Sequence, residues 1–111
     1  MRKDSNLISR GTRMERDRII EDILTYIKNR HGYLHEWYVG IGQDAEKRLF
    51  IDHQVDKKNG AWIYRIANSN REAREVVEFF LNKAVTDGES GGGDSAAIMV
   101  YAYKKASQAN P

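Results

Sequence analysis

Apolar and polar residues follow two different periods along the chain, and each period predicts one type of element. The first segment, residues 14–29, has an apolar stripe with the spacing of one helix face. The stripe consists of Ile19, Ile20, Ile23, Leu24 and Ile27. Thr12 and Glu15 have the spacing of a capping box, and Gly32 stands just beyond the last periodic residue. The pattern therefore predicts a helix over 14–29 that packs through its isoleucines.

Three shorter segments alternate with the period of a strand: 37–42, 61–67 and 97–104. In the first of them, Gly40 and Gly42 fall on the same face. Glycines at alternate positions leave that face bare, so a ligand or another side chain can approach the backbone closely. In the last strand, Met99, Tyr101 and Tyr103 share one face, which predicts a row of aromatic rings.

Two further helices are expected between these strands. Asp44 can cap a helix over 45–54, in which Ala45, Leu49 and His53 share a side. Ser69 and Glu72 form a second capping box before an apolar stripe made of Ala73, Val76, Val77, Phe80 and Ala84. The expected order is α-β-α-β-α-β. It predicts an α+β fold in which three helices flank a small three-stranded sheet in a layered sandwich.

Composition and charge narrow the function classes. The 111 residues suffice for one domain, expected over 14–105, with a short polar tail at 106–111. The absence of cysteine excludes disulfides, thiolate metal sites and a cysteine nucleophile. No apolar run is long enough for a membrane span, and we expect an intracellular, cytoplasmic protein. Residues 1–13 have a net charge of +3, which predicts a disordered basic tail or a weak nucleic-acid-binding arm.

A run of sixteen residues reads Tyr-Val-Gly-Ile-Gly-Gln-Asp-Ala-Glu-Lys-Arg-Leu-Phe-Ile-Asp-His. It resembles the second half of the signature of the GIY-YIG nucleases, where a Tyr-(Ile/Val)-Gly strand leads to a helix with an Arg-Leu pair and then a His. The matching residues are Tyr38, Gly40, Arg48, Leu49 and His53. The resemblance implies a phosphodiester-cleaving site that uses Tyr38, Arg48 and His53. An arginine suits this role, because a guanidinium can bind two phosphate oxygens at once.

The chain departs from the family pattern in two places. The family begins with a Gly-(Ile/Val)-Tyr strand, and no such strand precedes Tyr38. The last strand, with Val100 and Tyr101, could take that place, as in a circular permutation, and Tyr101 would then lie beside Tyr38. The family also holds a divalent metal such as Mg²⁺ through a helix glutamate. The resemblance assigns that role to Glu78, which is one residue away from the family's spacing.

Two other groups of residues are candidates for chemistry. His31 and His35 flank a turn, but without a third nearby ligand they do not predict a zinc site. The segment 86–95 is rich in glycine and acidic residues, which predicts a flexible connector, a phosphate nest or a cation site. The cation site would use Asp87, Glu89 and Asp94.

These observations leave two functions in competition. The first is a non-catalytic binding or interaction module of the GIY-YIG type, which recognises a partner protein or a phosphorylated ligand through the glycine-bared face. The alternative is a metal-dependent nuclease that hydrolyses phosphodiester bonds of DNA. The charge of residues 14–111, fourteen basic against fifteen acidic side chains, favours the first function. The unbroken match from Tyr38 to His53 favours the second.

Overall fold

The computed structural model describes residues 12–30, 33–84, 86–89 and 96–105. The expected tails lie almost entirely outside these ranges. The exceptions are Thr12 and Arg13, and Arg13 is part of a strand rather than of a tail. His31, Asp94 and the glycine run 91–93 also lie outside the described residues.

Both long helices form where the apolar stripes predict them. Helix α2 spans Arg16–Asn29 and buries Ile19, Ile23 and Ile27, while Ile20 and Leu24 are half-buried. Helix α3 spans Asn70–Asn82. Its N-terminus has the predicted cap, because Ser69 accepts a hydrogen bond from the backbone N–H of Glu72 at 3.1 Å.

The start of α2 differs from the prediction. The residue before the helix is Glu15, and its side chain makes no capping hydrogen bond. The carboxylate of Glu72 in α3 supplies the acceptor for the first turn, since the backbone N–H of Arg16 donates to its Oε1 at 3.1 Å. A contact between helices replaces the predicted local cap, so α2 begins two residues later than expected.

The three predicted strands are present, but the prediction of a three-stranded sheet is wrong. They are β2 (Trp37–Gly42), β3 (Trp62–Ala67) and β5 (Met99–Lys104). Two further strands of two residues each, β1 (Arg13–Met14) and β4 (Asp87–Gly88), extend the sheet to five strands in the order β1-β3-β5-β2-β4. The α+β class itself is confirmed. Each added strand pairs in parallel with its neighbour, so the sheet is mixed.

Strand β5 lies in the centre of the sheet, antiparallel to both β2 and β3. The last strand of the chain is therefore inserted between two strands that precede it by many residues. In this register Tyr101 is paired with Gly40 on one side and with Tyr64 on the other. This pairing brings the glycine-bared face of β2 against the tyrosine row of β5.

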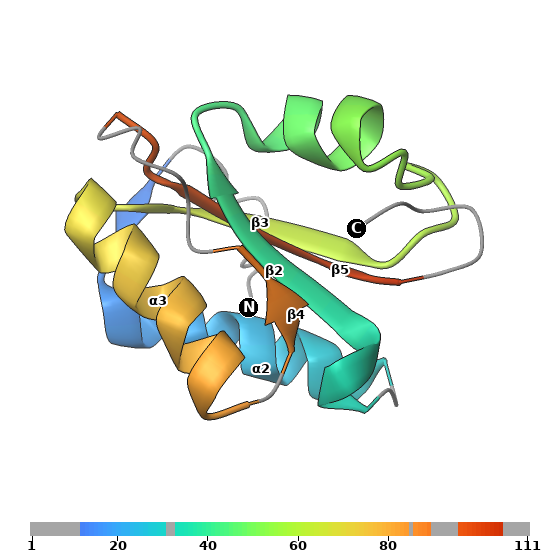
Figure 1. Cartoon of the computed structure of the whole chain (residues 1–111), viewed down its shortest axis with the longest axis horizontal. Helices are drawn as coiled ribbons and strands as arrows, with labels where there is room; N and C mark the ends of the chain where they lie inside the picture. Colours follow the sequence, from blue (N-terminus) through green and yellow to red (C-terminus); the bar gives the residue numbers. More distant parts are fainter. Residues whose placement is uncertain (1–11, 31–32, 85, 90–95, 106–111) are drawn as a thin grey trace, which may run out of the picture.

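Two layers cover the sheet (Figure 1). Helices α2 and α3 lie on one face and enclose the main apolar core. The segment 44–54 covers the other face, over a smaller cluster of mostly aromatic residues. This segment is helical as predicted, but its main turn, η2 (Lys47–Asp52), is π-helical rather than α-helical. Ala45, Leu49 and His53 are buried toward the sheet, as their shared side predicts.

The short helix η1 (Leu34–Glu36) leads directly into β2. Among the described residues, no helix has both the length and the apolar character that a bilayer crossing requires.

Candidate functional site

The two glycines of β2 make room for two side chains from other elements. A Cβ atom at position 40 would lie 2.5 Å from the hydroxyl oxygen of Tyr101, so the phenol ring lies directly on Gly40. A Cβ atom at position 42 would lie 2.9 Å from Cγ of Arg48. The bare face therefore holds a phenol from β5 and the stem of an arginine from η2. This confirms the expectation that Tyr101 lies on the same face of the sheet as Tyr38.

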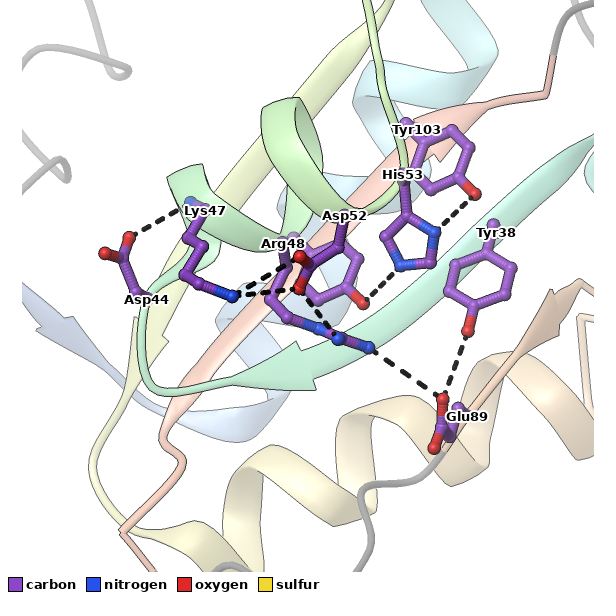
Figure 2. Close-up of polar contacts among 9 residues, drawn as sticks. Tyr38, Asp44, Lys47, Arg48, Asp52, His53, Glu89 and Tyr103 are labelled. Atoms are coloured by element: carbon purple, nitrogen blue, oxygen red, sulfur yellow. Dashed lines mark hydrogen bonds and ion pairs between the residues drawn. The ribbon is translucent and has the colours of Figure 1, made fainter. Parts of the chain in front are cut away.

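Buried hydrogen bonds connect His53 to two tyrosines on this same side of the sheet. His53 is only 5% exposed, and its Nε2 lies 2.9 Å from the hydroxyl of Tyr101. Its Nδ1 lies 3.2 Å from the hydroxyl of Tyr103 (Figure 2). The guanidinium of Arg48 lies close enough to the Tyr101 hydroxyl to influence its pKa. A guanidinium has no acceptor atom, so the Tyr101 hydroxyl can direct its proton at Nε2 of His53.

These contacts fix each group from two sides. The ring of His53 also packs against the ring of Tyr38, with centroids 4.8 Å apart. Tyr38 stacks on Tyr103 at 5.3 Å and on Tyr101 at 6.4 Å. We call Tyr38, Arg48, His53 and Tyr101 the tyrosine–arginine site. Three of its members lie within one run of sixteen residues, whereas Tyr101 comes from β5, 48 residues after His53. Packing holds each ring in one orientation.

At the surface, two groups of the site contact the same carboxylate oxygen of Glu89. The hydroxyl of Tyr38 donates to Oε1 of Glu89 at 3.5 Å, and Nη2 of Arg48 lies 3.9 Å from the same oxygen (Figure 2). Glu89 follows β4, which pairs with β2 and so carries the carboxylate to the site. The second partner of Arg48 is Asp52, at 3.0 Å, which also pairs with Lys47. Two donors thus converge on a single anionic oxygen that is open to solvent.

Burial raises the pKa of all three phenols in this region above the ordinary value of 10.0. It raises the pKa of Tyr38 to about 12, helped by the nearby Tyr101 and Glu89. It also raises the pKa of Tyr101, although the neighbouring Arg48 opposes the shift. Burial raises the pKa of Tyr103 as well. Near neutral pH, Tyr38 and Tyr101 are therefore hydrogen-bond donors and not phenolate bases.

The structure brings four of the five predicted site residues together and leaves out the fifth. Tyr38, Arg48, His53 and Tyr101 form one cluster. Glu78 is exposed on α3, where it lines a groove between the two long helices on the opposite face of the sheet. The helix that carries Glu78 packs through Val76, Val77 and Phe80, and this packing turns Glu78 away from the sheet.

The described residues do not fit the Mg²⁺ ion that the resemblance implies. In the part of the chain that the structure describes, no three His, Asp or Glu side chains are grouped to hold a metal ion. The carboxylates of the site, Asp52 and Glu89, both lie against the guanidinium of Arg48. Of the predicted loop site, Asp87 pairs with Lys105 and Glu89 with Tyr38. His35 stacks on the ring of Tyr33, with centroids 5.7 Å apart.

Sequence reasoning missed two roles within the site. Tyr103 was expected only as a strand aromatic, yet its hydroxyl holds the second nitrogen of His53. Glu89 was expected only as a cation ligand in a loop, yet it is the anion at the mouth of the site. The shared face of Tyr101 and Tyr103 was a signal for the first role. The role of Glu89 depends on the pairing of β4 with β2, and a strand of two residues is too short to be predicted from the sequence.

Comparison with protein-family models, with curated proteins and with solved structures gave no significant match. The geometry of the site is therefore the basis for the functional argument.

Proposed function

We propose that the tyrosine–arginine site binds a phosphate group, and that the chain is a non-catalytic module that recognises a phosphodiester of a nucleic acid. One observation carries this proposal: the hydroxyl of Tyr38 and the guanidinium of Arg48 converge on a single oxygen of Glu89. A phosphate oxygen in that position would meet the same two donors. The carboxylate of Glu89 stands in for it in the free chain.

The chemistry of the donors supports a phosphate ligand. A guanidinium binds phosphate oxygens through two parallel N–H groups, and such charge-assisted bonds are among the strongest in proteins. The stem of Arg48 lies on Gly42 and its Nη1 is held by Asp52 at 3.0 Å, so the group is oriented before a ligand arrives. Tyr38 adds a neutral donor that a phosphate cannot deprotonate at pH 7.

Glu89 is a weak competitor for the phosphate. Its side chain is 61% exposed, and its ion pair with Arg48 spans 3.9 Å. Exposed pairs of this kind contribute only about 0.2–1 kcal/mol. A ligand phosphate that binds Arg48 at shorter distance can therefore displace the carboxylate.

The charge of the chain limits the size of the contact. Residues 14–111 carry fourteen basic and fifteen acidic side chains, so their net charge gives little general attraction to a nucleic acid. We therefore propose recognition of one or two phosphates, with a shallow salt dependence of about one to two ions released. Nucleic acids are met inside the cell, so this proposal includes the intracellular location expected from the sequence.

A binding assay with matched variants tests the proposal. The probe is a short fluorescent single-stranded oligonucleotide, and its anisotropy is measured with the wild-type chain, Arg48→Ala, Arg48→Lys and Tyr38→Phe. We expect Arg48→Ala to weaken binding by about 10- to 100-fold, since a charge-assisted hydrogen bond contributes about 1.5–3 kcal/mol. Arg48→Lys keeps the positive charge but loses the two parallel N–H groups of the guanidinium. Its affinity should therefore lie between those of the wild-type chain and Arg48→Ala.

The control is Arg74→Ala, which removes the same charge from the exposed side of α3. If Arg74→Ala weakens binding as much as Arg48→Ala does, the attraction is general and the proposal fails. The same samples with added Mg²⁺ test the alternative, a metal-dependent nuclease that cleaves DNA. The convergence of Tyr38, Arg48, His53 and Tyr101 on one face is the observation that favours this alternative. Cleavage that disappears in Arg48→Ala would replace the binding module with the nuclease.

A further inference from the structure

A second surface lies on the other side of the sheet, in a groove between α2 and α3. The groove has a volume of about 600 Å³. Its apolar floor is formed by Ile20 and Leu24 of α2 and by Phe79 of α3. All three side chains are half-buried, and Phe79 is fixed by an edge-to-face contact with Phe80 at 5.3 Å. The floor is therefore an apolar surface that is partly exposed to solvent and in which Phe79 is held in place.

The rim of the groove is predominantly acidic. It carries four carboxylates and two cations: Asp17, Glu21, Glu75, Glu78, Arg16 and Lys83. Arg16 is already bound to two of the carboxylates, Asp17 at 3.1 Å and Glu75 at 3.0 Å. In the described part of the chain, no ion pair or hydrogen bond involves the side chain of Glu21 or Glu78. These two carboxylates therefore face solvent beside the apolar floor without a cationic partner.

We propose that this groove docks an amphipathic helix of a partner protein, with basic residues flanking its apolar face. The apolar side chains of that helix would lie on Ile20, Leu24 and Phe79. Its lysines or arginines would lie beside Glu21 and Glu78. This inference is independent of the tyrosine–arginine site, which lies on the opposite face of the sheet.

The elements that line the groove favour a helix over an extended peptide. A strand binds by pairing with an unpaired backbone edge, but both walls of this groove are helices whose backbone groups are bonded internally. Ile20 and Leu24 are one turn apart on α2, and helices present their apolar side chains at the same spacing. Side chains of a third helix can therefore interlock with this floor.

The charges favour a different protein over a second copy of this chain. In a two-fold pair the same surface faces itself, so the unpaired carboxylates of both copies would share one interface. Like charges in an interface are unfavourable, whereas a basic partner neutralises Glu21 and Glu78. The groove therefore fits a basic helix better than it fits itself.

A pair of designed peptides tests this inference. Each is a labelled helix of about 18 residues, long enough to hold its fold, with leucines along one face. The flanking positions carry lysine in the first peptide and glutamate in the second. The wild-type chain should bind the lysine peptide at least about 10-fold more tightly than the glutamate peptide, because opposite charges steer and hold the complex.

Charge-reversed variants locate the binding. Glu78→Lys should weaken the lysine peptide by about 5-fold and tighten the glutamate peptide, whereas Glu46→Lys on the opposite face should change neither by more than about 2-fold. Amide chemical shifts should move at residues 20–24 and 78–83 when the lysine peptide is added. The inference is overturned if both peptides bind equally, if the two variants behave alike, or if the shifts map elsewhere. A concentration-dependent dimer whose interface maps to residues 20–24 and 78–83 by amide chemical shifts would also overturn it, in favour of a second copy.

Discussion

Replacement of Gly40 by alanine is the sharpest test of how the site is built. The added Cβ would lie 2.5 Å from Oη and 2.6 Å from Cζ of Tyr101, distances that the two atoms cannot keep. The ring has no free space to retreat into, because Tyr101 is fully buried and its hydroxyl is held by His53 at 2.9 Å. The clash must therefore be relieved by a shift of the ring or of β5.

The loss of stability can be estimated from the cost of inserting an extra methyl group into a filled core. Such insertions cost about 1–3 kcal/mol. For a domain of this size that corresponds to a fall in Tm of about 5–15 °C. Phosphate binding should also weaken, because a displaced Tyr101 no longer orients Arg48. Thermal melts followed by circular dichroism, with oligonucleotide anisotropy on the same samples, measure both effects.

Gly42→Ala is the matched control. Its Cβ would lie 2.9 Å from Cγ of Arg48, but this side chain is 34% exposed, so it can leave its place beside Asp52 and relieve the contact without a shift of the sheet. We expect Gly42→Ala to lower Tm by less than about 3 °C and still to weaken binding, because the guanidinium moves. If Gly40→Ala melts within about 1 °C of the wild type, Tyr101 does not lie on Gly40 and the proposed site is wrong.

Three further changes probe the remaining parts of the site. Glu89→Gln removes the negative charge that competes with the phosphate. Anisotropy should therefore show oligonucleotide affinity rising by about 2- to 5-fold, which corresponds to the loss of one exposed ion pair. An unchanged or lower affinity would contradict the proposal that Glu89 occupies the place of the phosphate. Tyr103→Phe deletes the bond to His53 Nδ1 and should cost about 1–2 kcal/mol in urea unfolding, together with a loss of binding. Tyr26→Phe is the control, because it removes a hydroxyl that accepts from the backbone N–H of Trp62 on the other face of the sheet, and it should leave binding unchanged. Because burial raises the pKa of Tyr38 from 10.0 to about 12, its stabilising contribution is intact below pH 10 and is lost as the pH rises toward 12. Phenolate absorbance should accordingly show Tyr38, identified by its absence in Tyr38→Phe, titrating above the exposed tyrosines; a midpoint near 10 would refute its burial.

Much of the fold could be predicted because long periodic segments carry their own signal. The isoleucine stripe of α2 and the alternation in β2, β3 and β5 each repeat over several residues, and all four elements form within two residues of the expected bounds. The strands β1 and β4 could not be predicted, because two residues cannot establish an alternation. They form because the neighbouring strands offer unpaired backbone groups, and this is a property of the assembled sheet.

The site shows the same division between local and tertiary information. The bare face of β2 could be inferred from Gly40 and Gly42. Tyr101 was expected beside Tyr38 only if the last strand takes the place of the family's missing first strand, an arrangement that strand parity permits. The position of Glu78 could not be inferred, because the side of the sheet that a helix covers is set by connections and not by its own residues. The role of Glu89 was hidden for a similar reason, since only the pairing of β4 with β2 brings it to Arg48.

The measurement that tests the central claim most directly is a titration of the isotopically labelled chain with a dinucleotide that carries a single phosphodiester, followed by amide and arginine side-chain NMR. Our account predicts saturable shifts of the Arg48 Nε–H signal and of the amides of residues 40–42 and 89. It also predicts that these shifts are absent with the matching nucleoside, which lacks the phosphate. Shifts confined to the basic residues before position 14, or equal responses to dinucleotide and nucleoside, would contradict it.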